Sequence, residues 1–377
     1  MYHTTSADGK EDSMQDFRRF LTLDGLAVLP VLLAALLLGK WTLREAPLPT
    51  PPEASPEAVS HADEKQSRTA LPVHAADSEC DETAPPPAAA TPLWDESALL
   101  PVLVDGRLCT MKLSDYVFGA LAAEMPALFS EEALKAQAVA IRTDALYRLR
   151  QAYPHKDGAS CTSPSCCCGY LDDDALRLRW GDSYEAYSEK LRKAVSDTDG
   201  EILEYSGEPI FAAFHACSAG STENSEAVWV SSLPYLRSVS SPETAETVPN
   251  YYSEVTLSAE ALKAIAAEAL PAANLNGVCR DWLTEAEWNE SGRLSSVCVG
   301  GVPVSGSRLR SLLGLKSANI RWSCTDDEIR FTCAGSGHGV GLSQYGAELM
   351  AQEGNDYPAI LLHYYPGTER IRATAHD

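Results

Sequence analysis

The chain has 377 residues, of which 53 are Asp or Glu and 30 are Lys or Arg, so its formal net charge is −23. A chain this acidic argues against a surface that binds nucleic acid or wraps along anionic lipid. The length allows two average domains, and no internal repeat is visible. Composition therefore favours a chain that acts on neutral or cationic partners.

A short tail, residues 1–20, precedes an apolar segment at residues 21–43. Within it, Gly25–Gly39 reads GLAVLPVLLAALLLG and carries no charge, and with the leucines before it the stretch approaches the length of a membrane-spanning helix. A cleavable signal peptide is the alternative, but no small-x-small cleavage site follows Gly39. We therefore expect an uncleaved transmembrane anchor over residues 21–43.

Residues 44–96 are rich in Pro, Ala, Glu and Ser, as in APLPTPPEASPEA and APPPAAATP. Such a composition buries too little apolar surface to fold, so we expect a disordered, partly extended spacer. The folded domain is then expected to span residues 97–377. A domain tethered at a distance from a membrane is suited to acting on something fixed nearby.

The expected elements of this domain give a single α+β fold, with helices first and a β-rich part after them. Pro126 ends the first helix, because the residue before a proline is pushed out of helical geometry, and Ser130 is a suitable N-cap for the second. The predicted elements are strands at 101–104 and 111–113, helices at 114–124, 131–150 and 184–197, short strands after 201, and a helix at 343–351.

The segment before that last helix is unusually rich in glycine. Residues 335–354 read GSGHGVGLSQYGAELMAQEG, in which glycines alternate with small or polar residues and one imidazole, His338. Glycine at this density lets a backbone approach a ligand or another strand closely. A loop that enters a helix also directs backbone N–H groups outward. A tight turn followed by a buried helix is the alternative.

Glu124 is the carboxylate that stands out. It ends the first helix among Ala122, Ala123 and Met125. The negative end of a helix dipole and apolar neighbours both disfavour ionisation, which suits a general acid near neutral pH. An exposed surface glutamate is the competing interpretation. On the next helix, Gln137 and Arg142 could present hydrogen-bond donors to a polar ligand. The alternative is that they are ordinary polar side chains on a solvent-exposed helix face.

The chain has 11 cysteines, and a short loop concentrates several of them. His155, Cys161, Cys166 and Cys167 lie within HKDGASCTSPSCCCGY, and an imidazole with several thiolates suits tetrahedral zinc. A disulfide-containing loop and unpaired thiols are the alternatives. Four protein ligands would make the zinc structural, because no position is left for water.

Two further cysteine pairs lie in β-rich surroundings. Cys279 with Cys298, and Cys324 with Cys333, could form disulfides in an exported chain or remain buried thiols. The spacing in sequence does not decide between these alternatives.

Several motifs together resemble the stage II sporulation protein D family. They occur in order over nearly all of residues 113–368: LSDYVFGALAAEMPALFSEEALKAQAVAIRTDAL, CTSPSCCCGY, FHACSAGSTENSEAVW with PYLRSVSSP, GRLSSVCVGGVPVSGSRLRSLLGL, and GHGVGLSQYGAELMAQEG followed by ILLHYYPGT. The N-terminal anchor and spacer also fit the family.

The resemblance implies a peptidoglycan lytic transglycosylase that acts on peptide-stripped glycan strands during sporulation and engulfment. Its products are 1,6-anhydro-N-acetylmuramic acid ends, and the family's catalytic glutamate falls on Glu124. The chain would be a single-pass protein of the cell membrane with its catalytic domain on the wall-facing side. A partner amidase/endopeptidase and a polytopic membrane protein are implied. The motif residues implied in glycan binding are Gln137, Arg142, Ser218, Gly220, Thr222, His338, Ser343, Gln344 and Tyr345.

Some residues depart from the family pattern. Clostridial members often bind zinc through a Cys-x5-Cys pair with a His before the second Cys; here Cys166 replaces that His, and His155 is a possible extra ligand. The usual Ser-Gly-Gly has Ala219 in its middle. His338 could be a second acid/base or a structural hydrogen-bonding group, and we favour a ligand-facing role.

Two other functions remain open at this stage. One is a non-catalytic wall-binding module that enhances a partner amidase, as some relatives are described. The other is a zinc hydrolase, which would need an open metal site.

Overall fold

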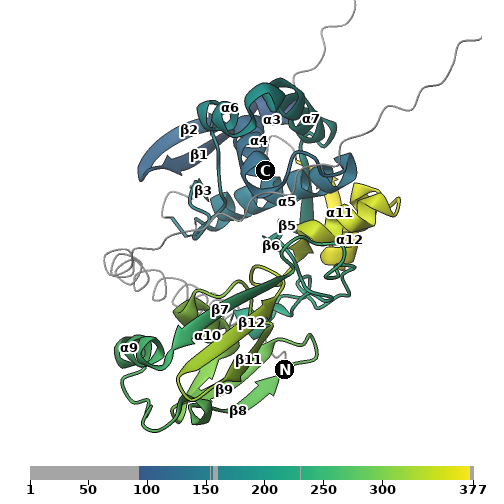
Figure 1. Ribbon diagram of the computed structural model, residues 1–377. Helices are drawn as coiled ribbons and strands as arrows, with labels where there is room; N and C mark the ends of the chain where they lie inside the picture. The colour runs from purple at the N-terminus through teal and green to yellow at the C-terminus, as the bar shows by residue number, and fades with distance from the viewer. Residues whose placement is uncertain (1–92, 153, 156–159, 230, 374–377) are drawn as a thin grey trace, which may run out of the picture. The chain divides into compact units, whose positions relative to one another are not determined.

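The computed structural model describes residues 93–152, 154–155, 160–229 and 231–373. The expected tail, the expected anchor and most of the expected spacer lie outside these residues. Within the described ranges, no helix has both the length and the apolar character needed to cross a bilayer. The described chain combines helices with several small sheets, a mixed α+β fold (Figure 1).

In the first part, two strands and three helices lie close to where the sequence predicts them, and three further short elements are not predicted; the second part mixes helices with strands. The helices are α3 (Trp94–Ser97), α4 (Leu113–Glu124), α5 (Glu131–Gln151), α6 (Asp173–Trp180), α7 (Tyr184–Asp197), α8 (Ser225–Val228), α9 (Ala259–Ala269), α10 (Gly306–Leu313), α11 (Gln344–Gln352) and α12 (Tyr357–Tyr364). The strands are β1 (Leu99–Val104), β2 (Arg107–Lys112), β3 (Ser160–Cys161), β4 (Glu201–Tyr205), β5 (Glu208–Pro209), β6 (Phe214–His215), β7 (Tyr252–Ser258), β8 (Leu283–Trp288), β9 (Leu294–Val299), β10 (Val302–Ser305), β11 (Ile320–Cys324), β12 (Glu328–Ala334), β13 (Leu342–Ser343) and β14 (Glu369–Arg372).

The strands form small separate sheets. Three-stranded sheets have the orders β2-β1-β3, β14-β4-β5, β10-β9-β8 and β11-β12-β7. The fifth sheet joins β6 and β13, which run parallel and pair Phe214 with Leu342 and His215 with Ser343. This last pairing matters most for the site, because it brings the glycine-rich segment beside a strand more than a hundred residues earlier.

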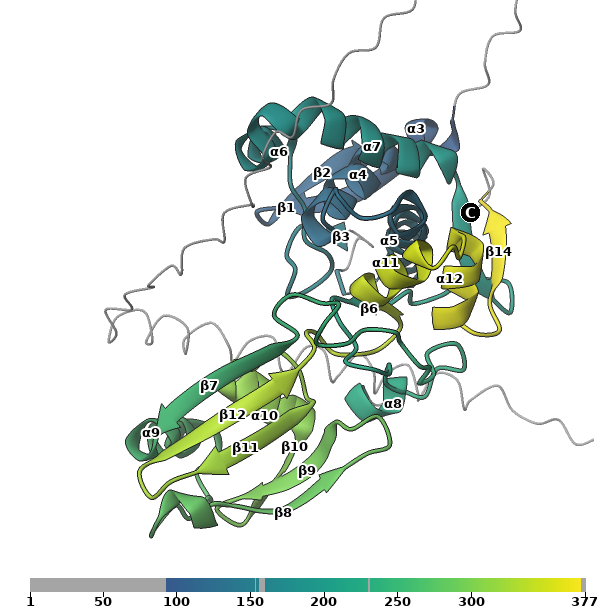
Figure 2. The ribbon, with the colours of Figure 1, turned by 45° about the vertical axis from the view of Figure 1, so that its right-hand side comes forward.

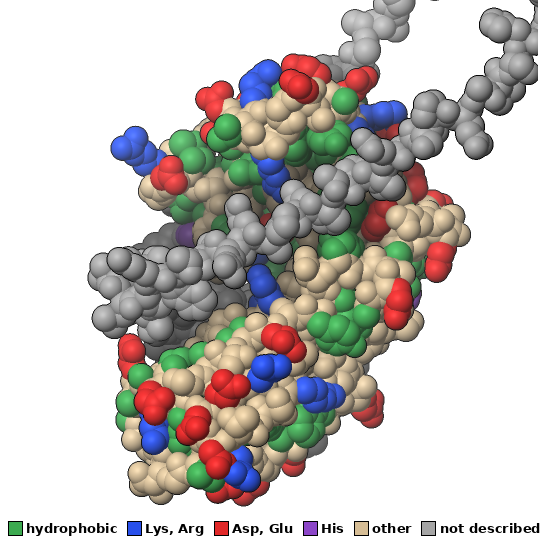
Figure 3. Space-filling model, in the orientation of Figure 1, with side chains coloured by type: hydrophobic (Ala, Val, Ile, Leu, Met, Phe, Trp, Pro, Cys, Tyr) green, Lys and Arg blue, Asp and Glu red, His purple; other side chains and the backbone are tan. Residues whose placement is uncertain are grey.

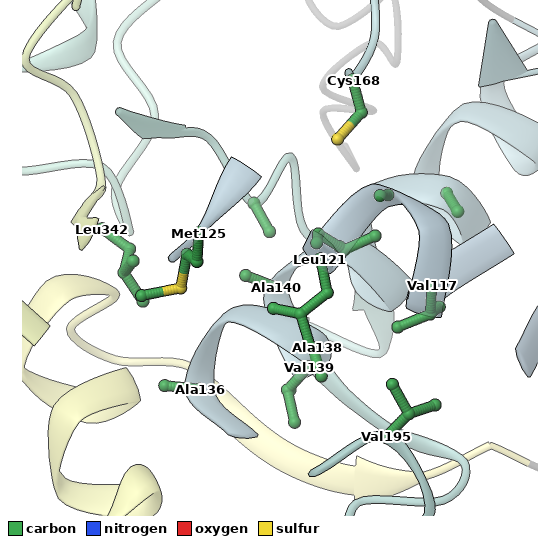
Figure 4. Packing of buried hydrophobic residues seen from close by; sticks show 14 of the residues in the cluster. Val117, Leu121, Met125, Ala136, Ala138, Val139, Ala140, Cys168, Val195 and Leu342 are labelled. Atoms are coloured by element: carbon green, nitrogen blue, oxygen red, sulfur yellow. The ribbon is translucent and has the colours of Figure 1, made fainter. Parts of the chain in front are cut away.

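Helix α5 lies at the centre of one hydrophobic cluster. Its alanine-rich sequence lets neighbours approach closely, and it packs against α4, α7, α11 and α12 (Figure 2). Figure 4 shows part of this cluster, including Leu121 of α4, Met125 and Leu342 of β13. The start of α5 is held by α11, since the Glu348 carboxylate accepts hydrogen bonds from the N–H (2.6 Å) and hydroxyl (3.1 Å) of Ser130.

A second hydrophobic cluster belongs to the β-rich part. It centres on buried side chains such as Trp282 and Phe331, and residues of α9 and α10 contribute to it. The sequence predicts only strands in this part, whereas the structure also has these two helices. Each begins at a serine that caps it: Ser258 accepts from the N–H of Ala261, and Ser305 from that of Arg308. These serine caps are the local signals that mark the two helices in the sequence.

The spacer ends earlier than expected. Residues 94–97 form α3, and Asp95 is only 2% exposed. The two N–H groups of Trp94 and Asp95 donate to the Asp199 carboxylate at 3.0 and 2.9 Å. The boundary at residue 96 is therefore corrected: the folded part includes at least residues 93–96.

The two cysteine pairs considered for disulfides are not bonded. All ten cysteines that the structure describes are free thiols. Cys333 pairs with Ile320 and Cys324 with Ile329, so these two cysteines lie at opposite ends of the β11–β12 ladder, too far apart for a bridge. Cys279 is buried and donates its S–H to the Thr325 carbonyl at 3.0 Å.

Candidate active site

Glu124 lies where three segments meet. It is the last residue of α4, it is partly exposed, and Met125 after it is extended, as expected before Pro126. Its Oε1 accepts a hydrogen bond from the Gly169 N–H at 2.9 Å, and the Cys168 sulfur lies 3.6 Å from the same oxygen. Its Oε2 accepts a longer bond, 3.4 Å, from the Gln344 amide. The carboxyl group is thus oriented by donors from both sides.

Gly169 approaches the carboxylate closely because it has no side chain. A Cβ at this position would lie 3.0 Å from Glu124 Oε1, tighter than ordinary contact. The following segment is docked on α4, since the Leu171 N–H donates to the Gly119 carbonyl at 3.2 Å. The cysteine-rich loop therefore forms one wall beside Glu124.

The first turn of α11 forms the opposite wall. Gln344, whose amide reaches Glu124, is buried, and the next residue, Tyr345, is partly exposed. The Tyr345 ring packs edge-on against Phe129 at a centroid distance of 5.2 Å. The predicted site residues Gln344 and Tyr345 are therefore brought to Glu124 and to the loop that follows it.

The four candidate metal ligands also converge. The ligand atoms of His155, Cys161, Cys166 and Cys167 all lie within 4.8 Å of one another. His155 Nε2 is 3.6 Å from Cys166 Sγ, and the sulfurs of Cys166 and Cys167 are 3.9 Å apart. One imidazole and three thiols are a donor set that structural zinc sites use. The residues present therefore fit a four-coordinate zinc ion.

The candidate metal loop and the Glu124 contacts are one continuous stretch. Cys166 and Cys167 supply two of the converging sulfurs, and Cys168 and Gly169, next along the chain, contact Glu124. Burial raises the pKa of the Cys168 thiol, so it stays a neutral donor. Any interaction that fixes the conformation of this loop therefore also fixes the position of the groups that contact Glu124.

A buried polar network contacts the start of α11, and two of its members, His215 and Glu243, are not predicted from the sequence. His215 Nε2 lies 2.8 Å from the Ser218 hydroxyl, and the Ser218 N–H donates to Glu243 Oε1 at 3.0 Å. The Ser343 hydroxyl donates to the same Glu243 oxygen. Burial lowers the pKa of His215 well below its usual value, so it is neutral. No local pattern marks these residues: His215 stands alone among apolar residues, and Glu243 lies in a stretch of polar residues like any loop glutamate.

Arg142 is not at the site. Its guanidinium is fully buried and bonds Asp95, with Nη2 2.6 Å from Oδ2 and Nε 2.9 Å from the same carboxylate. Further bonds go to the carbonyls of Glu201 (3.1 Å) and Val195 (3.2 Å). Arg142 has no donor turned to solvent, so the expected glycan-binding role is corrected to a structural one.

Other predicted residues are buried or lie in the loop after β6. Gln137 is fully buried, and among the described residues neither atom of its amide has a hydrogen-bond partner. Thr222 is buried and its hydroxyl accepts the Val239 N–H at 2.9 Å, so it shapes the loop. Gly220 is exposed with a φ of 98°. Ser218 and Ser343 belong to the buried network.

His338 lies against aromatic rings. Its centroid is 5.1 Å from that of Trp229 and 5.6 Å from that of His215, and its Nδ1 accepts the Val340 N–H at 3.1 Å. Burial lowers the pKa of His338 to about 3. The imidazole is therefore neutral near pH 7, and the bond that its Nδ1 accepts from the backbone is in keeping with the hydrogen-bonding role.

Comparison with known proteins places the chain in a family. A family model described as stage II sporulation protein matches residues 107–205. Stage II sporulation protein D of Bacillus subtilis (strain 168) is 37% identical over 265 residues, which cover 70% of this chain and 75% of that protein. The chain belongs to the stage II sporulation protein D family.

Two further relatives extend the comparison. Stage II sporulation protein D of Bacillus amyloliquefaciens is 35% identical over 260 residues, covering 68% of this chain and 73% of the relative. A Bacillus subtilis protein named amidase enhancer is 29% identical over 304 residues, covering 66% of this chain and 39% of its own length. Membership of the family links the chain to sporulation. Glu124 and the four candidate metal ligands lie inside the matched residues 107–205.

Proposed function

We propose that the chain is a lytic transglycosylase of peptidoglycan with Glu124 as its acid/base. The observation that carries the proposal is the setting of Glu124, a partly exposed carboxyl group at a helix end with donors on both oxygens. Donors on both oxygens fix the orientation of the carboxyl group, and a fixed carboxyl group that a ligand can reach is what general acid–base catalysis requires. The substrate class follows from the family, in which the motifs around Glu124 occur.

The reaction needs one carboxyl group. Protonated Glu124 gives its proton to the glycosidic oxygen between N-acetylmuramic acid and N-acetylglucosamine as the C1–O bond breaks. The resulting carboxylate takes the proton of the C6 hydroxyl of the muramic acid, whose oxygen bonds to C1. A 1,6-anhydro end forms, and no water is consumed. Hydrolysing glycosidases instead use a pair of carboxylates.

The two groups that donate hydrogen bonds to Glu124 suit its change from acid to base during the reaction. The Gly169 N–H and the Gln344 amide stabilise the carboxylate after it has given up its proton, since preorganised donors act most where charge develops. Oε2, held by the longer bond of 3.4 Å, is the oxygen better placed to exchange a proton with the sugar. Tyr345 and Gln344 would contact the glycan from the α11 side.

We also propose one structural zinc ion held by His155, Cys161, Cys166 and Cys167. When bound, it would cross-link the loop and leave no position for water. A zinc hydrolase is therefore disfavoured, because its metal needs an open position. The chemistry stays with Glu124.

The cellular setting rests on the family. On the face drawn in Figure 3, basic and acidic side chains of the described residues are interspersed, so neither sign of charge dominates that face. We propose that residues 21–43 anchor the chain in the cell membrane, with the described part facing the wall. A partner amidase/endopeptidase and a polytopic membrane protein would act with it in engulfment.

A second function is supported by one observation, the relative named amidase enhancer. In that alternative, the chain binds wall glycan without cutting it and stimulates an amidase. The partly exposed Glu124 with its two donors favours the enzyme over the binding module, because a binding module has no need of an oriented acid.

The test is digestion of peptide-free glycan strands by the purified full-length chain, with the ends identified by mass spectrometry. Glu124→Gln keeps the size of the side chain and should lower the rate at least about 10²-fold. Glu189→Gln, on the exposed face of α7, is the matched control. Anhydro ends from wild type and control, but not from Glu124→Gln, support the enzyme. Reducing ends would indicate a hydrolase, and binding without cleavage by all three proteins would favour the enhancer.

A further inference from the structure

The first turn of α11 touches Glu124, but α11 itself must be held in place. Gln344 bonds Glu124 Oε2 at 3.4 Å, a distance at which a small shift of the helix breaks the bond. Strand β13 and the Tyr345 N–H, which donates to the Ala216 carbonyl at 3.0 Å, fix the backbone on the β6 side. One buried side chain fixes the residue before Gln344.

That side chain is Glu243, which is 2% exposed. Its Oε1 accepts from the hydroxyl of Ser343 and from the Ser218 N–H at 3.0 Å. Ser343 is the N-cap of α11 and accepts from the Gly346 N–H at 3.4 Å. Glu243 therefore ties the loop after β6 to the cap of the helix that carries Gln344.

The surroundings of Glu243 leave little freedom for α11. The Ser241 N–H donates to the Gly220 carbonyl at 3.0 Å, and the Ser241 hydroxyl bonds the Tyr364 hydroxyl at 2.7 Å. A Cβ on Gly346 would lie 2.0 Å from the Tyr364 oxygen. The first turn of α11 is packed without space on this side, so this packing and the Glu243–Ser343 contact together set where Gln344 lies.

We propose that Glu243 is a positioning residue for Glu124, acting through Ser343 and Gln344. Its second oxygen, Oε2, is buried without a hydrogen-bond partner among the described residues. A buried carboxylate oxygen left unpaired is costly, which is consistent with a residue kept for placement rather than for stability alone. The assignment rests on the proposed function, because it gives Glu243 a role in orienting that acid.

The test is a double-mutant cycle between Glu243→Gln and Gln344→Ala in the full-length chain, with anhydro-end formation as the assay. Glu243→Gln keeps the shape of the side chain. We expect it to lower kcat about ten-fold with KM changed less than about two-fold, because a misplaced acid affects the chemical step. In the Gln344→Ala background the same change should lower kcat less than about two-fold further.

Two more variants make the result decisive. Ser343→Ala cuts the link at another atom and should reproduce the pattern if Glu243→Gln folds poorly. Glu246→Gln, an exposed glutamate on the same loop, should leave both constants unchanged. Two results would overturn the role of Glu243 and leave the proposed function standing. One is that the effects of Glu243→Gln and Gln344→Ala on kcat multiply. The other is that Glu243→Gln lowers the melting temperature with kcat unchanged. A wild-type chain that yields no anhydro ends would overturn the proposed function and this role with it.

Discussion

Arg142 and Glu124 lie on neighbouring helices, and the family motifs predict that both act on glycan, but their surroundings differ. Arg142 is fully buried and every bond it makes is internal, to Asp95, to the Thr198 hydroxyl and to backbone carbonyls. Glu124 is partly exposed, and the groups that bond it leave it open to a ligand. A charge paired on all sides builds the fold, whereas a half-exposed charge with oriented donors is suited to chemistry.

The largest expected effect on stability comes from a substitution at Arg142. Arg142→Ala leaves Asp95 buried without its partner, and breaking a buried pair in this way costs about 3–5 kcal/mol. We expect the free energy of unfolding in urea to fall by that amount. Arg142→Lys should also destabilise, because an ammonium cannot reproduce the bonds that the guanidinium makes to Asp95 and to two carbonyls.

Arg177→Ala is the matched control, because the exposed guanidinium of Arg177 on α6 pairs with the exposed carboxylate of Glu185 on α7. It should change the free energy of unfolding by less than about 1 kcal/mol. If Arg142→Ala kept wild-type stability and instead weakened glycan binding, Arg142 would belong with Glu124 and the comparison would fail.

The sequence predicted the helices near Glu124 well, because each carries local signals. The expected helix at 184–197 is α7, and those at 114–124 and 131–150 differ from α4 and α5 by one residue. Pro126 marks where α4 ends, and the apolar spacing along 131–150 predicts α5. The sequence also predicted the mixed α+β class. The family motifs assign both Glu124 and Gln344 to one site, and the structure brings these two residues into contact.

What could not be predicted depends on contacts between distant residues. Asp95, 47 residues before Arg142, lies in a Pro- and Ala-rich stretch that reads as spacer. Glu243 and His215 are single residues with no periodicity around them. Short helices such as α6 and α12 also escaped, because a few turns give too little pattern against the surrounding sequence.

The loop on one side of Glu124 can be tested by removing the metal it is proposed to hold. Cys161→Ser should lower the zinc content measured by mass spectrometry from one equivalent towards none. Because the same loop presents Gly169, hydrogen exchange of residues 166–171 should quicken. Anhydro-end formation should fall about ten-fold, as expected when a positioned acid loses part of its support.

Cys298→Ser is the control, since its half-exposed thiol lies on β9, outside the cluster. It should leave zinc content, exchange and activity unchanged. A zinc-free Cys161→Ser protein with wild-type protection of Gly169 would mean that the loop is ordered without metal, and Glu124 would then depend mainly on the α11 side.

The smallest expected effect lies in the loop after β6. Ala219 has a φ of 62°, a left-handed conformation that costs an L-residue about 1–2 kcal/mol. Ala219→Gly removes this strain but adds freedom to the unfolded chain, so we expect a net gain in the free energy of unfolding of about 0.5–1 kcal/mol. Ala245→Gly, at an exposed position without positive φ, should instead destabilise slightly. If both substitutions destabilise the protein equally, packing of the Ala219 methyl group against Gly335 offsets the backbone strain. The loop that brings Ser218 to Glu243 would then be held by side-chain contacts and not by backbone preference.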